Sequence, residues 1–310
     1  MRIAVLGVGG VGGYLAHRLM AAGHEVAVLA RGAHLEAIRS GGLVLEDEPA
    51  GTEEAVRPAL ATDDPSALGA ADLVVIAVKG QDLPPLLPRL RPVMGEWGVA
   101  LPFLNGVEAP GLLAETFGEE RALIGTARIG AWIAAPGRVR KITRHAIFTF
   151  GDTEGRQDRD RLRAIREAFA AAGISAPEHP DVRVDLWEKF VLLAPFAAVT
   201  AGGRCDTGTV RRTPELLGLY ETLVAEAVAV ARARGVAFAE TAVEDAVQGL
   251  AKLPEAMRAS LAHDLEAGKP LELDWLSGAV VRLGEAAGVA TPAHRTAMAL
   301  LAPWRDGANR

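Results

Sequence analysis

The chain has 310 residues, half of them hydrophobic and 23% charged, so we expect a well-buried globular protein with room for two domains. The net charge of −6 excludes nucleic acid as the main partner, because no basic excess exists to neutralise phosphates. The single cysteine, Cys205, excludes an intramolecular disulfide, which fits a reducing compartment, and we expect a bystander role for that thiol.

The first half of the chain alternates short apolar runs with helical patterns. The pattern predicts a helix over Val11–Ala22, which Gly23 ends, and four strands at Ile3–Leu6, Val26–Leu29, Leu73–Val78 and Ala100–Leu104. Unbroken apolar strands separated by helices indicate a parallel sheet covered on both faces.

The pattern changes between Leu123 and Gly151. Three further strands are expected at Ile129–Ala134, Val139–Ile142 and Ala146–Phe150, with a turn at Pro136-Gly137. We expect them to form an antiparallel or mixed edge of the same sheet.

The rest of the chain is predicted to be helical. A helix over Arg156–Ala172 precedes the loop Gly173–Arg183, and six more are expected at Leu186–Val199, Pro214–Arg234, Glu240–Lys252, Glu255–Glu266, Leu273–Ala287 and Pro292–Leu301. We therefore expect an α/β Rossmann-type domain over residues 1–175 and an all-α domain over residues 176–310. The longest apolar run, Phe190–Gly203, is too short to span a bilayer and no signal-peptide pattern opens the chain, so we expect a cytoplasmic protein.

The clearest chemical signal is a glycine-rich turn directly after the first strand. Its residues are Gly7, Val8, Gly9, Gly10, Val11 and Gly12. Gly7 permits the tight turn, Gly9 lets the backbone approach a pyrophosphate, and Gly12 allows the helix to pack on the strand. The phosphates are expected at the positive end of the helix. A GxGxxG pattern alone is weak, but its strand–turn–helix context here favours a dinucleotide-binding site.

The second strand ends in Leu29-Ala30-Arg31-Gly32. A site for NAD would carry an acidic residue there to accept hydrogen bonds from the ribose hydroxyls. The guanidinium of Arg31 instead suits a 2′-phosphate, so NADPH is favoured over NADH. The alternatives are that Arg31 stacks on adenine or faces solvent.

Two polar residues follow apolar strands, where ligands gather in doubly wound sheets. Lys79 lies in Val78-Lys79-Gly80-Gln81-Asp82, and Asn105 lies in Leu104-Asn105-Gly106-Val107. The alternatives are a solvated strand end for Lys79 and a plain turn residue for Asn105.

Lys189 begins an otherwise apolar helix. Next to the apolar side chains of this helix, the Lys189 amine loses hydration. This loss lowers its pKa towards the range useful for giving a proton to a carbonyl oxygen. The alternative is a lysine that snorkels beside Glu188 or Asp185. Ser260 and Glu272 stand in the segment that precedes the Leu273–Ala287 pattern, where a plain first-turn helix charge would explain the glutamate equally well. The seven histidines are scattered without a Cys/His cluster, so no metal is expected.

In combination these motifs resemble the ketopantoate reductase family from end to end. The resemblance rests on GVGGVGG, the Arg31-Gly32 segment, VKGQD, LNGVE, LWEKF, and a serine twelve residues before the glutamate of KPLELDWLSG, in this order. It implies a 6-phosphogluconate-dehydrogenase-like architecture, in which substrate binds between a nucleotide domain and a helical domain.

The resemblance also implies roles for individual residues. Lys189 matches the catalytic lysine and Glu272 the acidic residue that holds a substrate hydroxyl. Ser260 matches the serine that holds the substrate carboxylate, and Lys79 and Asn105 match the strand-end lysine and asparagine of the family. All three are implied to bind substrate: Ser260 and Asn105 orient its carboxylate and carbonyl, and Lys79 lies near the nicotinamide and the carbonyl. Lys79, Asn105 and Glu272 are also implied to contact the cofactor. The implied reaction is NADPH-dependent reduction of a 2-oxo acid, with ketopantoate to pantoate, in pantothenate and coenzyme A biosynthesis, as the leading candidate.

One departure from the family pattern bears on the substrate. Reductases that make pantoate typically carry asparagines one and two turns after the catalytic lysine, where this chain has Leu193 and Ala197. A reductase of a less hydroxylated substrate is therefore the first alternative, and Arg204 is a candidate for meeting its carboxylate or for capping the helix. A non-catalytic NADP(H)-binding regulator is the second alternative. The small-molecule substrate is the expected partner, and a homodimer through the helical domain is plausible.

Overall fold

The computed structural model describes residues 1–154 and 159–308. The chain forms two compact units. Unit 1 comprises Met1–Leu104 and Ala109–Asp185, and unit 2 comprises Asn105–Glu108 and the chain from Leu186 onward. The boundary placed between residues 175 and 176 from the sequence falls inside unit 1, ten residues before Asp185.

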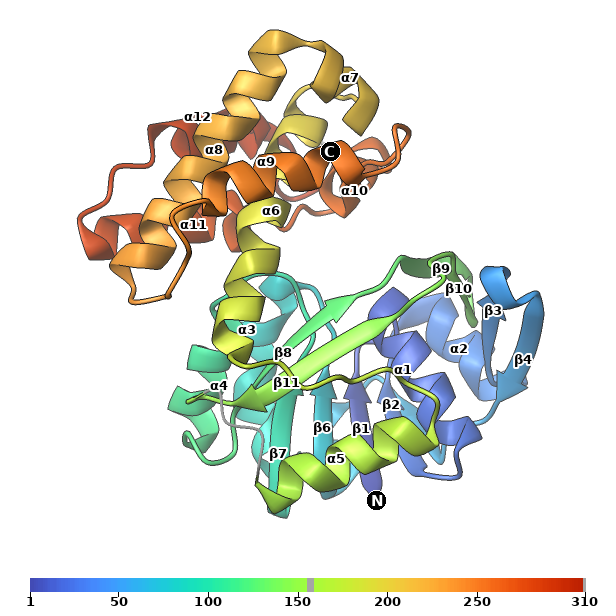
Figure 1. Ribbon diagram of the computed structural model, residues 1–310. Helices are drawn as coiled ribbons and strands as arrows, with labels where there is room; N and C mark the ends of the chain where they lie inside the picture. The colour runs from blue at the N-terminus through green and yellow to red at the C-terminus, as the bar shows by residue number, and fades with distance from the viewer. Residues whose placement is uncertain (155–158, 309–310) are drawn as a thin grey trace. The chain divides into compact units, whose positions relative to one another are not determined.

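Unit 1 is built on a five-stranded parallel sheet, as the apolar runs predict (Figure 1). Its strand order is β5 (Leu60–Thr62), β2 (Glu25–Leu29), β1 (Arg2–Leu6), β6 (Ala71–Ile76) and β7 (Met94–Pro102). The central strand β1 is almost wholly buried from Ile3 to Leu6, which explains its unbroken apolar sequence. Among its described residues, this unit carries the helices α1 (Gly10–Ala21), α2 (Gly32–Gly41), α3 (Leu83–Leu86), α4 (Ala109–Phe117) and α5 (Asp160–Ala171).

The remaining strands of unit 1 do not extend this sheet, and the expectation of a mixed edge was wrong. One separate sheet has the order β4 (Thr52–Val56), β3 (Leu43–Asp47), β10 (Arg138–Lys141) and β9 (Ala131–Ala135). A second pairs β11 (Ile147–Asp152) with β8 (Leu123–Arg128). The sequence pattern missed β3 and β4 because the apolar run of β3 is only three residues long and β4 is almost fully exposed. It also could not show that β10 pairs in parallel with β3.

The helix expected over Arg156–Ala172 is α5, which begins at Asp160, and Arg156 lies outside the described residues. Its buried face meets an aromatic cluster in the core of unit 1. Phe169 of α5 packs edge-on against Phe148 and Phe150 of β11, with ring centroids 6.4 and 5.5 Å away. Aromatic burial of this kind stabilises the covering of the two-stranded sheet.

Unit 2 is helical throughout, as expected. Its helices are α6 (Val182–Gly202, whose first turn counts with unit 1), α7 (Thr207–Arg212), α8 (Pro214–Ala233), α9 (Ala242–Lys252), α10 (Ser260–Glu266), α11 (Ser277–Ala287) and α12 (Pro292–Leu301). Two expectations need correction. The Glu255–Glu266 helix begins only at Ser260, and the Leu273–Ala287 helix is split into a 3-10 turn, η5 (Leu273–Trp275), and α11. Among the described helices, none combines the length and apolar character that a membrane crossing requires.

A buried polar group joins three helices of unit 2. The carboxylate of Glu226 on α8 accepts hydrogen bonds from the first backbone amides of α12, at Ala293 and His294. The His294 ring is fully buried and pairs through Nδ1 with Ser277 Oγ at 3.1 Å and through Nε2 with the Leu223 carbonyl at 3.0 Å. Because a carbonyl only accepts, the neutral ring donates from Nε2 and accepts from Ser277.

Candidate functional site

At two positions of the glycine turn in unit 1, Gly7 and Gly12, neighbouring backbone atoms leave no room for a side chain. Gly7 has φ +89°, and a Cβ there would lie 2.7 Å from the Ala77 carbonyl oxygen. A Cβ on Gly12 would lie 2.0 Å from the Gly7 carbonyl oxygen. Both positions therefore require glycine for the fold itself, because the turn and the helix–strand approach exclude any larger residue.

Gly9 differs from the other glycines of the turn. It is the N-cap of α1 with extended backbone, and a Cβ there would meet no atom within 4 Å. The helix begins with no side-chain cap and no acidic residue in its first turn. The side of the turn at Gly9 is thus open and electropositive, which fits a pyrophosphate at the helix N-terminus.

Two further elements brace the turn. The carbonyl of Ala131 on β9 lies so close to Gly10 that a Cβ there would come within 2.0 Å. The ring of His34 donates from Nε2 to the carbonyl of buried Val8 at 2.8 Å and accepts at Nδ1 from the Gly137 amide at 3.0 Å. Burial lowers the pKa of His34, which favours this neutral form. Val11 packs against the core, so the turn is fixed from three sides.

Arg31 lies at the carboxyl end of β2, where the sequence predicts it. Its side chain is 82% exposed, and Nη2 donates to Asp82 Oδ2 at 3.1 Å. Asp82 belongs to a 3-10 turn, η3 (Gly80–Asp82), for which Lys79 is the N-cap residue. Strand β6 ends at Ile76, so Lys79 follows it at a distance of three residues and is half-buried.

A second polar group lies in unit 2. Lys189 Nζ donates to Asn105 Oδ1 at 3.3 Å, and Asn105 Nδ2 donates to Glu272 Oε2 at 3.4 Å. Glu272 is 3% exposed and precedes η5 as its N-cap, while Lys189 and Asn105 are half-buried. An ammonium, an amide and a carboxylate therefore form one hydrogen-bonded row, which joins three distant parts of the sequence.

The short segment Asn105–Glu108 is held in place by unit 2. Glu108 Oε2 accepts from Arg282 Nη2 at 2.6 Å, and the same nitrogen reaches the Asp274 carbonyl at 2.8 Å. Gly106 has φ +95°, and a Cβ there would lie 3.0 Å from the Trp275 carbonyl oxygen. The Asn105-Gly106 turn therefore does more than connect two elements, because it places the Asn105 amide within hydrogen-bonding distance of Lys189 and Glu272.

The face of α6 around Lys189 is apolar. Leu192 and Leu193 are half-buried at the positions three and four residues after the lysine, and Phe190 is fully buried. Ala197, one turn further, is 1% exposed. The positions one and two turns after Lys189 on its own helix therefore carry the apolar side chains of Leu193 and Ala197.

Two residues singled out in the sequence stay apart from this row. Ser260 is exposed at the first position of α10, and no hydrogen bond joins it to Asn105, Lys189 or Glu272 within the described residues. Arg204 has φ +48° at the end of α6, and its guanidinium stacks over the Trp304 ring, 5.3 Å from the centroid. Arg204 thus packs on an aromatic side chain in unit 2.

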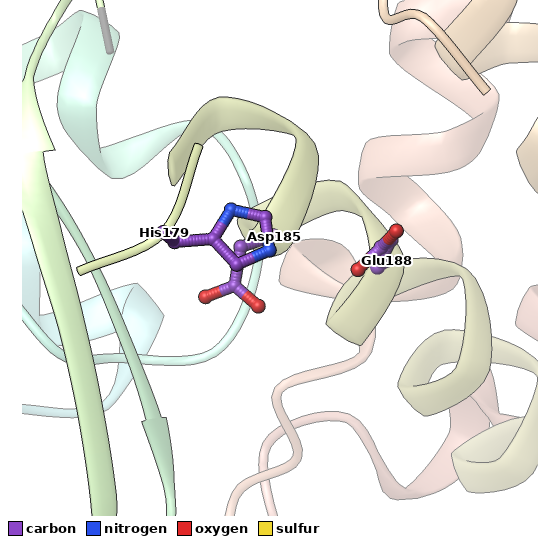
Figure 2. Close-up of side chains that lie close together, drawn as sticks. All are labelled: His179, Asp185 and Glu188. Carbon is purple, nitrogen blue, oxygen red and sulfur yellow. The ribbon is translucent and has the colours of Figure 1, made fainter. Parts of the chain in front are cut away.

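Asp185, at the start of α6, is not the partner of Lys189 that its spacing allows. Its buried carboxylate pairs with Arg128 Nη2 at 2.6 Å and accepts from Thr126 at 2.7 Å and from Thr149. Burial raises the pKa of Asp185, but the hydrogen bonds from Arg128, Thr149 and Thr126 outweigh it and hold that pKa below its usual range. Figure 2 shows Asp185 with His179 and Glu188. Because both Asp185 oxygens already have partners, these three side chains make a poor metal site.

The structure brings together the predicted residues Lys189, Asn105 and Glu272, and separately forms the glycine turn with Arg31 and Lys79 in unit 1. It adds His34, Asp82 and Asp185, which the sequence analysis did not select. Only Asp185 left a local signal, as an acidic residue in the first turn of a long apolar helix. His34 and Asp82 act through contacts between distant segments, which no local pattern reveals.

Comparison with known proteins gives consistent matches over the whole chain. Residues 3–155 match the family described as ketopantoate reductase PanE/ApbA, and residues 181–304 match its C-terminal part. The 2-dehydropantoate 2-reductase of Halobacterium salinarum is 33% identical, covering 99% of this chain and 100% of that protein. The 2-dehydropantoate 2-reductase of Mesorhizobium japonicum is 30% identical, covering 97% of each chain. The crystal structure of a PanE/ApbA family ketopantoate reductase from Ralstonia eutropha superimposes with a TM-score of 0.88 at 31% identity, covering 98% of each chain.

Proposed function

The chain belongs to the ketopantoate reductase family, a family of dinucleotide-binding oxidoreductases that act on CH–OH groups, and on that premise we propose that it reduces a 2-oxo acid to a 2-hydroxy acid with NADPH. The leading substrate is ketopantoate, which would place the product pantoate on the route to pantothenate and coenzyme A. The observation that carries the proposal is the row Lys189–Asn105–Glu272 in a chain that also holds an open glycine turn.

The glycine turn and Arg31 would hold the cofactor. The open side at Gly9 and the uncapped start of α1 suit the pyrophosphate, and the exposed guanidinium of Arg31 suits a 2′-phosphate. When bound, NADPH supplies the hydride that the carbonyl carbon receives. Lys79, half-buried beyond the end of β6, is the candidate for contacting cofactor and substrate from unit 1.

Lys189 supplies the proton for the carbonyl oxygen. Its amine donates to Asn105 Oδ1, and an amine is the general acid that would give a proton to an oxygen on which negative charge develops. The Asn105 amide bonds to both the Lys189 amine and the buried Glu272 carboxylate and so links the two side chains. Glu272 Oε2 accepts from Asn105, and a carboxylate is an acceptor that suits a substrate hydroxyl. We assign the substrate carboxylate to Ser260, whose exposed position leaves its hydroxyl accessible.

The test is oxidation of NADPH, followed by absorbance, with ketopantoate and a panel of 2-oxo acids. Turnover of ketopantoate above all others supports the leading substrate. Nucleotide binding without turnover of any acid contradicts the proposal and favours a non-catalytic regulator. The Lys189→Ala variant separates enzymatic oxidation from background in the same assay.

A second candidate is the reduction of an apolar 2-oxo acid, and the leucine face of α6 favours it. Leu193 is half-buried one turn after Lys189, and its side chain offers no hydrogen bond to a substrate hydroxyl. Trimethylpyruvate differs from ketopantoate only by lacking the hydroxyl, so the two acids form a matched pair. A higher kcat/KM for trimethylpyruvate supports the second candidate. Leu193→Asn would then shift the ratio towards ketopantoate, because a buried hydrogen-bonding group discriminates against a substrate without its partner.

A further inference from the structure

The ion pair between Arg31 and Asp82 joins two segments that the sheet keeps apart. Arg31 follows β2 and Asp82 follows β6, and these strands flank β1 on opposite sides. The 3.1 Å contact therefore passes over the carboxyl end of β1, where the glycine turn begins. Asp63 and Asp64 follow β5, and Asp64 is already paired with Arg89 at 2.8 Å.

The pair is unequal in exposure. The Arg31 side chain is 82% exposed and that of Asp82 is 32% exposed. Asp82 is fixed by its backbone, because its amide donates to the Lys79 carbonyl at 2.9 Å within η3. The carboxylate is thus the more rigid partner, and the long arginine side chain reaches to it. An exposed pair of this kind contributes at most about 1 kcal/mol to folding, so stability gives little reason for it.

We propose that Asp82 is a specificity-determining residue, which weakens the preference for a 2′-phosphate by competing with that phosphate for Arg31. This inference rests on the proposed function, in which Arg31 meets the 2′-phosphate of NADPH. A 2′-phosphate next to Arg31 shares the guanidinium with Asp82 or displaces it, and in both cases lies near the fixed carboxylate, a charge of its own sign. A ribose 2′-hydroxyl meets no such repulsion, because it can donate a hydrogen bond to a carboxylate.

The experiment measures binding rather than turnover. Titration calorimetry with 2′,5′-ADP and with 5′-ADP, two probes that differ in the 2′-phosphate, is carried out on the full chain and on three variants. Asp82→Asn keeps the shape and removes the charge, and Arg31→Ala removes the phosphate partner. Glu285→Gln is the matched control, because it removes one charge from an exposed ion pair, with Arg295 at 2.6 Å, in unit 2.

We expect Asp82→Asn to tighten 2′,5′-ADP by roughly three- to tenfold, as removal of a nearby like charge in solvent predicts, and to leave 5′-ADP nearly unchanged or slightly weaker. Glu285→Gln should alter neither. Weaker binding of 2′,5′-ADP to Asp82→Asn would overturn the inference, since it would make Asp82 a support for Arg31. Equal changes for both probes would overturn it as well.

The underlying assignment of Arg31 fails separately. If Arg31→Ala weakens both probes equally, the proposed recognition of the 2′-phosphate is wrong, whatever Asp82→Asn does. Thermal unfolding of each variant without nucleotide checks that the fold is intact, and a midpoint within a few degrees of the parent is expected for an exposed pair.

Discussion

Asn105 donates its amide to Glu272 Oε2 at 3.4 Å, although 167 residues separate the two in the sequence. The same side chain accepts from Lys189, so its oxygen must face the amine and its nitrogen the carboxylate. In this orientation, the one amide of Asn105 links the side chains of Lys189 and Glu272. Variants of this row, of the glycine turn and of the buried side chains of His294 and Asp185 test these assignments.

Replacing Lys189 by alanine is expected to lower kcat by roughly a hundred- to ten-thousandfold, the range for loss of a general acid. Affinity for NADPH should stay nearly unchanged, because the glycine turn lies in unit 1. Steady-state turnover and nucleotide titration measure the two effects. Lys252→Ala, at the exposed end of α9, is the control that removes the same charge elsewhere in unit 2. Loss of nucleotide binding with normal turnover would remove Lys189 from the chemistry.

Two glycines of the turn should respond in opposite ways to alanine. Gly9→Ala should keep the thermal midpoint, since its Cβ meets nothing within 4 Å, and should weaken dinucleotide binding, since the methyl enters the open side. Gly12→Ala should destabilise the fold, since its Cβ would lie 2.0 Å from the Gly7 carbonyl oxygen. Thermal unfolding and nucleotide titration on both variants decide this. Normal affinity in Gly9→Ala would show that no ligand approaches there.

His294 should make unit 2 sensitive to mild acid. Burial lowers its pKa to about 4, below the value of about 6.5 in an unfolded chain. The unfolded state therefore binds the proton first, and stability is full above about pH 6.5 and falls as the pH drops towards 4, by up to roughly 3 kcal/mol. Urea unfolding between these pH values measures the slope. His294→Gln should be less stable at neutral pH and show a shallower slope, and an unchanged slope would contradict the assignment.

Asp185→Asn should destabilise unit 1 by about 2–3 kcal/mol at neutral pH, because the amide leaves Arg128 without its buried charge partner. The lowered pKa of Asp185 adds a pH dependence. Its contribution is present above the unfolded pKa of about 3.9 and is lost as the pH falls through the lower folded value. The difference between parent and variant in urea unfolding should therefore shrink in strong acid. Glu285→Gln, at an exposed pair, is expected to cost little at any pH.

Local sequence signals were sufficient to predict the elements that depend on an apolar run or on glycine spacing. The strand β1, the glycine turn and α1 lie where apolar runs and glycine spacing place them, within one residue at each end. The strands β3 and β4 were missed because β3 has an apolar run of only three residues and β4 is exposed. Their pairing with each other and of β3 with β10 forms the sheet. Sheet membership depends on such distant pairings, so the separation of three sheets could not be predicted.

The candidate site shows the same limit. Lys189 stands out locally as the last charge before the long apolar part of α6, although the helix begins seven residues earlier, at Val182. Glu272 has no local feature that distinguishes it from an ordinary helix charge. Its selection depended on the family resemblance, and its burial beside Asn105 is a property of the folded chain alone. Asp82 and His34 were missed because each binds a partner more than twenty residues away.

The division of the chain between its units has a consequence for recombination. The polypeptide leaves unit 1 at Leu104, contributes Asn105–Glu108 to unit 2, returns at Ala109 and leaves again after Asp185. A chimera spliced from two relatives near residue 180 would therefore inherit Asn105 from one parent and Lys189 with Glu272 from the other. Such hybrids should lose activity more often than hybrids in which Asn105–Glu108 comes from the same parent as the helices of unit 2. The reason is that the row Lys189–Asn105–Glu272 takes residues from both sides of the splice.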